Sequence, residues 1–234
     1  PRTLRRVENL ERWIHCITWY TWALQEQPHY IAAGDNPDVD GATMIDIIDK
    51  DPEALAKIRA MRLLGIMPRE KDLDICIFNH NAADKTRAPE SGYAVLTEQY
   101  VLPANTLSED EWLAFKKNHA EDVMSLLGKH TTNVNWDNVI GYIPLTPYDH
   151  CRLANMAPTG TWAVVDHGVI SQYGRYRPVP ELANHRTPVQ NLYATGSAWP
   201  PFGGSGCWQG YNCYKILAED FGLRKPWEEQ GRPW

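Results

Sequence analysis

The chain has 234 residues, with ten tryptophans, five cysteines, a formal net charge of −6 and an isoelectric point near 5.7. This length suffices for one large domain or two small ones, and the acidic balance argues against a polyanion-binding surface, which needs clustered Lys and Arg. The cysteines are odd in number, widely spaced and without a CxxC pair, so we expect a reduced, cytoplasmic protein. No run approaches the roughly 18 apolar residues of a membrane span.

Four segments of the first two thirds are predicted to be strands. Residues 13–24 are apolar on both faces, as in a strand that is covered on both sides. In residues 73–78, Leu73, Ile75 and Ile77 alternate with Asp74, Cys76 and Phe78, and residues 93–102 are a second extended run. The two are predicted to pair as a long hairpin in which the carboxylates of Asp74 and Glu98 face water. Residues 139–145 form a further short strand. Together with the helices, they predict an α/β fold in which a mixed or antiparallel sheet is flanked by helices.

Two helices carry recognisable start signals. Residues 51–53 (Asp-Pro-Glu) supply a side-chain cap, a proline for the first turn and an acid near the positive helix end, and Gly65 is expected to end this helix. Ser108 and Glu111 form a capping box for the second helix, which is expected to end at Gly128.

Residues 148–190 are rich in proline, glycine and aromatic side chains and are predicted to be irregular. A stretch this long is rarely an idle loop, so we expect it to fold around or wrap a site. Its candidate acid/base groups are Asp149, His150, His167, Tyr173 and His185. None has a diagnostic spacing, and a packed structural histidine is the alternative for each histidine. The eight histidines and five cysteines do not group at ligand spacing, so no metal site is predicted.

Residues 191–223 are predicted to form a strand, a glycine-rich loop and a helix. The strand covers residues 192–194, and the helix begins near Ser205 or Gly206 and continues to about Asp220. Glycines let the backbone approach a ligand closely, and the unpaired N–H groups of a first helical turn suit an anion or an electron-rich carbonyl. The alternative is a tightly packed turn that uses glycine only for its backbone angles.

Two phosphate-binding motifs do not account for this segment. Gly204, Gly206 and Gly210 form GxGxxxG, but a dinucleotide fold needs a second parallel strand and an acid about 20 residues further on, and only the polar residues 224–234 follow. No Gly-Lys-Ser/Thr occurs, which excludes a Walker A loop.

The segment resembles the C-terminal signature of phytoene-desaturase-like flavoproteins and related flavin amine oxidases, in which a strand ending in Gly-Ser leads through a Pro/Gly loop into a final helix. The matching positions are residues 187–193, Gly196-Ser197, Pro201, Gly203-Gly204 and Gly206, and the likeness extends upstream to about Val139. The chain departs from the family at residues 199–202 (Trp-Pro-Pro-Phe), where the family has His-Pro or a similar pair. Two additional aromatic rings beside the cofactor are therefore implied.

The resemblance implies an FAD cofactor and desaturase- or saturase-type hydride transfer between a substrate carbon and flavin N5. It further implies that the final helix points its first turn at the pyrimidine side of the flavin, with Gly196 and Ser197 along the ribityl and phosphate portion. The implied cofactor-binding residues are Gly196, Ser197, Trp199, Gly203, Gly204, Ser205, Gly206, Cys207 and Trp208. Residues 1–186 would then be a substrate-binding region, residues 187–223 the contribution to the FAD site and residues 224–234 a tail.

In the resembling enzymes, an N-terminal GxGxxG motif binds the ADP half of FAD, and this sequence has no such motif before residue 191. We therefore expect a second chain, or a missing N-terminal half, that carries it, and a small apolar or cyclic substrate. Two rival functions stay open: a structural or regulatory subunit that keeps the fold without the chemistry, and a carrier of apolar ligands.

Overall fold

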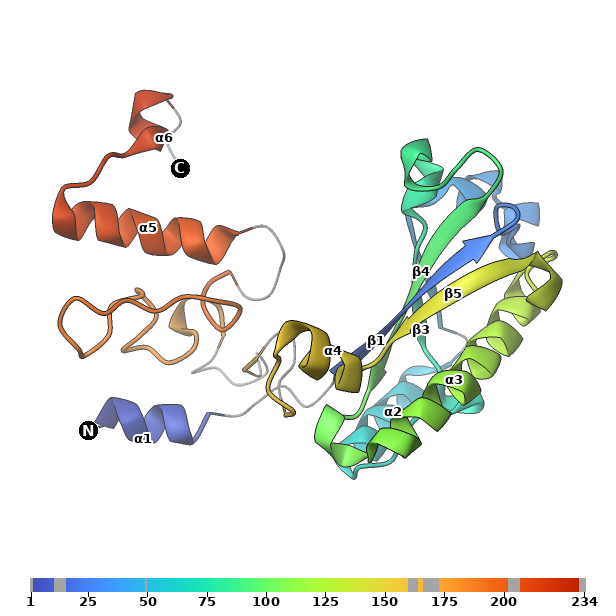
Figure 1. Ribbon diagram of the computed structural model, residues 1–234, viewed down its shortest axis with the longest axis horizontal. Coiled ribbons are helices and arrows are strands. Elements are labelled where there is room, and N and C mark those ends of the chain that lie inside the picture. Colours follow the sequence, from blue (N-terminus) through green and yellow to red (C-terminus); the bar gives the residue numbers. More distant parts are fainter. Residues whose placement is uncertain are drawn as a thin grey trace. The chain divides into compact units, whose positions relative to one another are not determined.

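The computed structural model describes residues 2–10, 16–48, 50–159, 164–165, 173–201 and 207–231. They belong to two compact units (Figure 1). The sheet unit spans Ile14–Thr159, and the C-terminal unit joins Pro1–Trp13 to Gly160–Trp234. Within the described ranges, no helix is long and apolar enough to cross a membrane.

The sheet unit is built on five strands in the order β2-β3-β4-β1-β5, and every pairing between them is antiparallel. The strands are β1 (Cys16–Leu24), β2 (Met44–Ile47), β3 (Ile75–Phe78), β4 (Tyr93–Val101) and β5 (Val139–Leu145). The predicted α/β fold is confirmed, and the sheet is antiparallel rather than mixed. The predicted hairpin of β3 and β4 is also confirmed, whereas the short edge strand β2 was not predicted.

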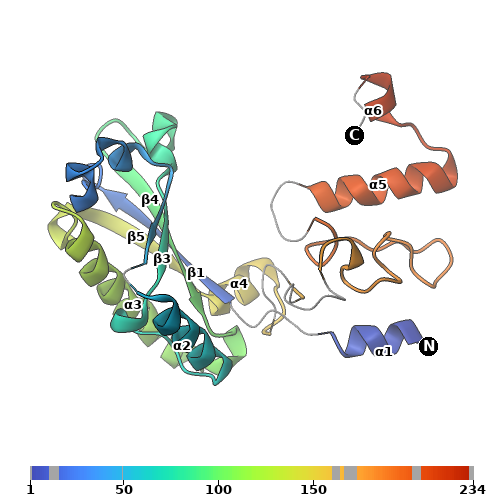
Figure 2. The ribbon, with the colours of Figure 1, turned by 180° about the vertical axis from the view of Figure 1, so that it is seen from behind.

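One face of the sheet is covered by the helix α3 (Glu109–His130), which lies along it in both ribbon views (Figures 1 and 2). Successive strand residues point to opposite faces, so Tyr20, Trp22 and Leu24 all point into the core, where Val123 and Leu127 of α3 also lie. The Trp22 Nε1 atom donates to Thr97 Oγ1 over 2.9 Å, which satisfies the buried indole. Burial of each such side chain contributes about 2 kcal/mol.

The two capped helices start where the sequence predicts. Asp51 accepts a hydrogen bond from the Ala54 backbone over 2.8 Å at the start of α2 (Pro52–Leu63), and the capping box at Ser108 opens α3. The predicted end of α3 at Gly128 is wrong, because the helix continues to His130. A Cβ atom at Gly128 would lie 3.5 Å from the Val134 carbonyl oxygen, so this glycine admits a returning backbone instead of ending the helix.

The expectation that the chain is irregular from Tyr148 onwards is wrong at its start, where α4 (Pro147–Ala154) forms. The backbone and hydroxyl groups of Thr146 both donate to Asp149 Oδ2, over 2.8 and 2.7 Å. Pro147 occupies the first turn, and Asn155 ends the helix in the left-handed conformation at φ 52°. These residues form a capping box with proline at the helix start, a signal that the sequence carried.

The C-terminal unit contains α1 (Arg2–Glu8), α5 (Trp208–Phe221) and α6 (Pro226–Glu229). Arg6 ties α1 to the rest of this unit through an ion pair with Glu181 at 2.8 Å. The expected strand at 192–194 does not form, because the chain turns back on itself at Asn191 (φ 61°) and only an isolated antiparallel bridge joins Arg186 to Tyr193. The first described residue of α5 is Trp208, and the predicted helix start at Ser205 or Gly206 lies outside the described residues.

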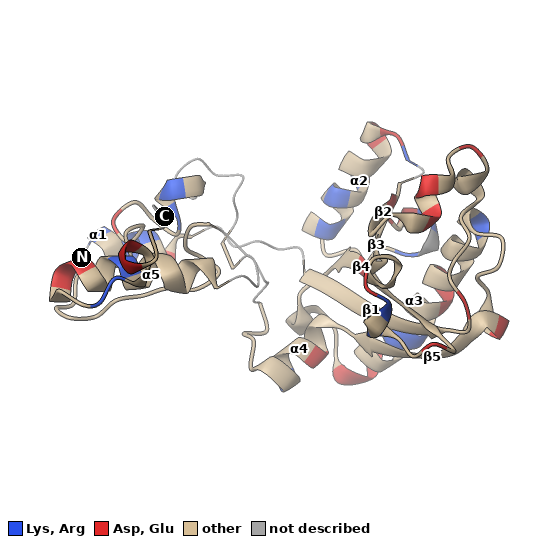
Figure 3. Cartoon of the chain, turned by 90° about the horizontal axis from the view of Figure 1, so that it is seen from above, with Lys and Arg blue, Asp and Glu red and all other residues tan. Residues whose placement is uncertain are grey.

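Charged residues of both signs are interspersed over the sheet unit (Figure 3). Among the described residues of this unit, Lys and Arg are therefore mixed with Asp and Glu. Most ion pairs join exposed groups, and these contribute little to stability. The pair of Lys116 Nζ and Asp149 Oδ1 differs, since it is 2.6 Å long and its side chains are only 20% and 15% exposed.

Candidate functional site

The sheet face opposite α3, here called the outer face, is mainly apolar and aromatic. It consists of the alternate strand side chains that do not point into the core: Trp19, Thr21, Ala23, Met44, Asp46, Cys76, Phe78, Ala94, Leu96, Glu98, Tyr100, Gly141, Ile143 and Leu145. Met44 and Ile143 are 56% and 63% exposed. An accessible apolar sheet face of this kind is a surface on which an apolar molecule can bind.

A carboxyl group lies in the middle of the outer face. Glu98 is half-buried and accepts a hydrogen bond from Trp19 Nε1 over 2.8 Å, with Trp19 directly opposite it on the neighbouring strand. Burial raises the pKa of Glu98, the hydrogen bond from Trp19 opposes this rise, and the nearby Asp46 carboxylate adds to it. Glu98 therefore points away from the core, as expected, but it is only partly exposed and its carboxyl group is partly desolvated beside the Trp19 indole.

His150 lies beside the same tryptophan. The two ring centroids are 5.4 Å apart, and α4 presents the histidine at the end of β5. Burial lowers the pKa of His150, although Asp149 acts in the opposite direction. Its Nε2 atom is buried and has no hydrogen-bond partner among the described residues. The lowered pKa favours the neutral imidazole, which can take up a proton, and its Nε2 atom is covered in this structure.

In the C-terminal unit, the segment before α5 is fastened to that helix by Asp220. Arg186 donates to both carboxylate oxygens over 2.8 and 2.7 Å, and the Tyr193 hydroxyl donates over 2.6 Å. These hydrogen bonds lower the pKa of Asp220 to about 2. The carboxylate therefore stays ionised over the physiological range and fixes the 186–193 turn against the C-terminal end of α5.

The other end of α5 is fastened to the proline pair. Gln209 and Asn212 donate side-chain hydrogen bonds to the carbonyls of Pro201 and Pro200, over 2.6 and 3.0 Å. Trp199 donates to the Leu182 carbonyl over 2.8 Å, and its ring stacks on that of His185 at 6.3 Å. The residues on both sides of the glycine-rich loop are therefore held to the same helix or to the turn beside it.

The first turn of α5, which these contacts position, has no negatively charged side chain of its own to offset its partial positive charge. The first turn of α5 contains no acidic residue, and Cys207, which precedes it at φ 58°, gives no side-chain cap. Cys207 and Trp208 are both exposed, Trp208 by 53%. Gly196 has φ 143°, and a Cβ atom there would meet nothing within 4 Å. A first turn that carries a partial positive charge, with no acid or side-chain cap among the described residues, can hold an electron-rich oxygen.

The predicted site residues are distributed over both units. Gly196, Ser197, Trp199, Cys207 and Trp208 lie in the C-terminal unit around the ends of the glycine-rich loop, and Tyr173 lies in the same unit with 63% of its surface exposed. His150 lies in the sheet unit. His167, Gly203, Gly204, Ser205 and Gly206 lie outside the described residues. His185, also a candidate, is buried and contacts the Ala194 carbonyl oxygen at 3.1 Å, as a structural histidine does.

The prediction missed Glu98 and Trp19 as site residues. The available signal was that Glu98 is the one charged residue of β4, whose sequence is YAVLTEQYV. All five cysteines are free, and the described residues contain no group of three or more potential metal ligands.

Comparison with known proteins relates the chain to oxidoreductases. No protein-family model matches it. Over 211 residues, 87% of the chain, it is 28% identical to Pyridine nucleotide-disulfide oxidoreductase domain-containing protein 2 of Rattus norvegicus, of which it covers 35%. It is also 27% identical over 152 residues to a limonene dehydrogenase subunit from Castellaniella defragrans, a match that covers 62% of the chain and 27% of that protein.

A solved oxidoreductase structure from Methanosarcina mazei covers 93% of the chain at 15% identity and a TM-score of 0.47, with 36% of that structure included. The chain spans about a third of the length of the curated relatives it matches. Similarity to proteins named as oxidoreductases thus extends over most of the chain.

Proposed function

We propose that the chain forms part of an FAD-dependent oxidoreductase, in which the C-terminal unit faces the flavin and the sheet unit faces the substrate. The observation that carries this proposal is the similarity to oxidoreductases over 87% of the chain, an extent that takes in residues of both units. The resemblance of residues 187–206 to the phytoene-desaturase-like signature supports a desaturase- or saturase-type reaction.

The start of α5 fits the electron-rich edge of a flavin. Bound FAD would supply the atom that accepts or donates the hydride. The backbone N–H groups of the first turn would stabilise negative charge on a neighbouring oxygen or nitrogen, because no acidic side chain lies in that turn and no side chain caps it. Trp199 and Trp208 would provide flat apolar surfaces beside this charge.

The outer face of the sheet unit would bind the substrate. Its apolar and aromatic side chains favour a small apolar or cyclic molecule, since burial of such a molecule removes apolar surface from water. His150 Nε2 would accept or return a proton there, because the ring is neutral and this nitrogen is free among the described residues. The Glu98 carboxyl, held by Trp19, would be the second proton-handling group.

A second polypeptide, or a longer form of this chain, would complete the cofactor site. It would supply the GxGxxG motif that binds the ADP half of FAD. The contact would include Leu192, which is 52% exposed, and the exposed face of α5 with Phe221, which is 50% exposed.

The proposal is tested by the flavin content of the protein purified in its native assembly. We expect flavin absorbance and release of FAD on denaturation. A colourless assembly would contradict the proposal and favour a non-catalytic role.

A pair of variants tests the role of the helix start. Cys207→Asp places a negative charge beside the first turn of α5, and Cys207→Asn is its uncharged match of the same shape. Both side chains tolerate the left-handed conformation, and an acid at this end stabilises a helix by about 0.3–1 kcal/mol. The aspartate should nevertheless lower the flavin reduction potential by tens of millivolts relative to the asparagine, because the reduced ring is anionic. Equal potentials in the two variants would show that the helix start does not contact the flavin.

A further inference from the structure

The two edges of the five-stranded sheet differ in how well they resist the addition of a further strand. β5 forms one edge and β2 the other. β5 carries Pro144, which has no backbone N–H, and its register with β1 shifts so that Ile140 is an extra residue without a partner on β1. Proline and a bulge both hinder strand addition. β2 has neither, since its sequence is MIDI and its register with β3 is continuous, so this edge is the one that can accept another strand.

The hydrogen bonds at the start of β2 show which of its backbone groups point away from β3, to the free edge. The Asn79 N–H donates to the Thr43 carbonyl over 2.8 Å, one position before Met44 in the register with β3. Hydrogen-bonded and non-hydrogen-bonded pairs alternate along an antiparallel ladder, so the N–H and C=O groups of Met44 and Asp46 point to the free edge. They have no backbone partner among the described residues. β2 thus offers two donors and two acceptors to an added strand.

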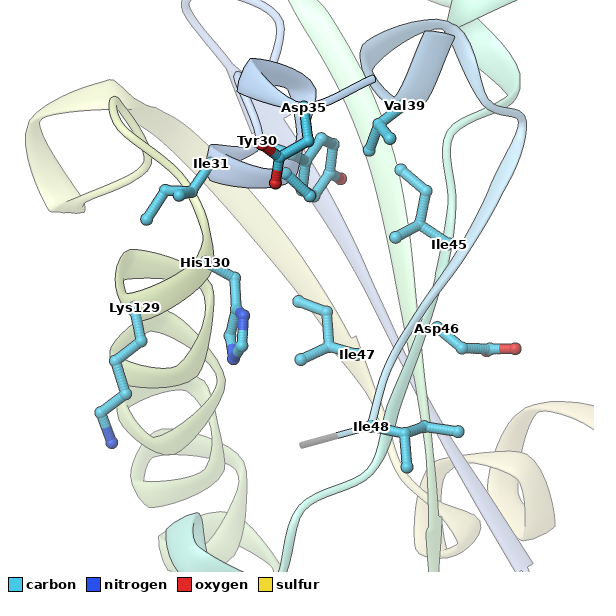
Figure 4. A pocket seen from close by; sticks show the side chains of 11 residues that line it. Tyr30, Ile31, Asp35, Val39, Ile45, Asp46, Ile47, Ile48, Lys129 and His130 are labelled. Atoms are coloured by element: carbon cyan, nitrogen blue, oxygen red, sulfur yellow. The ribbon is translucent and has the colours of Figure 1, made fainter. Parts of the chain in front are cut away.

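The space beside this edge is bordered by aliphatic side chains. A hollow of about 400 Å³ lies between β2 and the last turn of α3 (Figure 4). Ile45 and Ile47 border it, whereas the Asp46 carboxylate points away from it (Figure 4). Met44 and Ile48 are 56% and 51% exposed. A strand beside β2 would lie next to these side chains, which favours an extended segment with apolar residues.

The hydrogen bonds of an edge this short cannot by themselves hold a free peptide. Each of the four would raise the affinity about threefold to tenfold, or about 10⁴-fold at most together. The loss of translational and rotational freedom of a free peptide costs as much or more. A segment that is already held elsewhere avoids most of this cost, because its effective concentration is high. The occupant is therefore part of a polypeptide that contacts this chain at other places too.

We propose that an extended segment of the polypeptide that completes the cofactor site adds to the sheet beside β2 as a further antiparallel or parallel strand. This inference rests on the proposed function, which requires such a polypeptide. The chain spans about a third of the length of its curated relatives, which leaves most of their length to supply the segment. Alternate side chains of the segment would be apolar and would point to the hollow beside Ile45 and Ile47.

The test is hydrogen exchange of single amides, measured by mass spectrometry on the isolated chain and on the native assembly or longer form that contains it. In the isolated chain, the amides of Met44 and Asp46 should exchange fast and those of Ile45 and Ile47 slowly. In the assembly, the Met44 and Asp46 amides should exchange at least about tenfold more slowly, whereas β5 should not change. Unchanged exchange of β2, or protection of β5 in its place, would overturn the inference. Slow exchange of Met44 in the isolated chain that is lost on dilution would identify a second copy of this chain as the occupant, and would overturn it too.

A pair of variants separates strand addition from other contacts of the same surface. Met44 is the first residue of β2 and its N–H points to the free edge, so Met44→Pro removes one donor without removing a hydrogen bond to β3. Met44→Ala is the matched control, because it truncates the side chain and keeps the N–H. Met44→Pro should raise the dissociation constant of the assembly about threefold to tenfold more than Met44→Ala does, or, in a longer single chain, speed the exchange of Asp46 by the same factor. The urea midpoints of the two isolated variants should be equal, and equal behaviour of the two variants in the assembly would contradict the added strand.

The flavin content of the same sample keeps this inference apart from the proposed function. A flavin-loaded assembly with unprotected β2 amides would overturn the inference alone. A colourless assembly with protected β2 amides would support the added strand and refute the proposed flavin chemistry alone.

Discussion

Replacing Gly196 by alanine tests whether the segment before α5 depends on a backbone conformation that only glycine adopts readily. Gly196 has φ 143°, and a Cβ atom there would meet no other atom within 4 Å. The cost of the substitution is therefore purely conformational, about 1–3 kcal/mol. With a urea dependence of about 1–3 kcal/mol per molar, the unfolding midpoint of the C-terminal unit should fall by about 1 M.

Hydrogen exchange of the α5 amides at increasing urea concentrations measures this change, because it reports on the C-terminal unit alone. Gly141→Ala is the matched control: a Cβ atom at Gly141 also meets nothing within 4 Å, but the residue lies in β5 with an ordinary φ. Alanine there should leave the sheet unit unchanged or slightly more stable, since glycine weakens strands. If the α5 amides of Gly196→Ala exchanged as fast as those of the unaltered chain, alanine would cause no strain at position 196. The inference that this turn helps to position α5 would then be wrong.

Three further predictions concern single side chains. Burial lowers the pKa of His119 from 6.5 to about 4, so between these pH values the unfolded chain binds a proton that the folded chain does not. The free energy of unfolding should therefore fall by up to about 3 kcal/mol as the pH drops from 6.5 to 4. His119→Phe should flatten this pH dependence, as measured by urea titrations at each pH. Asp149→Asn should lower the free energy of unfolding by about 2 kcal/mol at neutral pH, because it leaves Lys116 unpaired. The double variant with Lys116→Met should recover part of this loss, and additive losses of the two single variants would exclude a coupled pair. Cys207 has φ 58°, where glycine is unstrained and a β-branched residue is strained. Cys207→Gly should therefore slow hydrogen exchange in the first turn of α5, and Cys207→Val should accelerate it. Equal exchange rates in the two variants would refute this prediction.

The sheet was predictable where the chain repeats a period over many residues. In β4, buried and partly buried positions alternate over all nine residues. β1 was predicted from apolar side chains on both faces, but the expectation that both faces are covered is wrong from Trp19 onwards, where exposed and buried positions alternate. The capping signals at Asp51 and Ser108 were equally reliable, because a side chain that accepts a backbone N–H acts locally. β2 was not predicted, although β3, which is also four residues long, was found because its alternating pattern starts two residues earlier, at Leu73.

The site was predictable only in part, since its chemistry depends on contacts between distant residues. The helix of α5 was expected from a local glycine-rich pattern, and its predicted start at Ser205 or Gly206 lies outside the described residues. The pairing of Glu98 with Trp19 joins positions 79 residues apart, and the pKa of the acid depends on that contact and on burial. The strand expected at 192–194 does not form for a similar reason. Tyr193 is joined to Arg186 by an isolated bridge and donates its hydroxyl to the Asp220 carboxylate, and it has no continuous partner strand among the described residues.

The alternation of β1 explains how one strand can serve both the core and the candidate site. Trp22 points into the core and is fully buried, whereas Trp19 points to the outer face and is 37% exposed. β1 pairs with β4 on one side and β5 on the other, so its backbone is held on both sides. Trp19 therefore contacts the Glu98 carboxyl and the His150 ring from a fixed position. The proton transfer proposed for these two residues would need this fixity, because small displacements of an acid or base cost much of its effect.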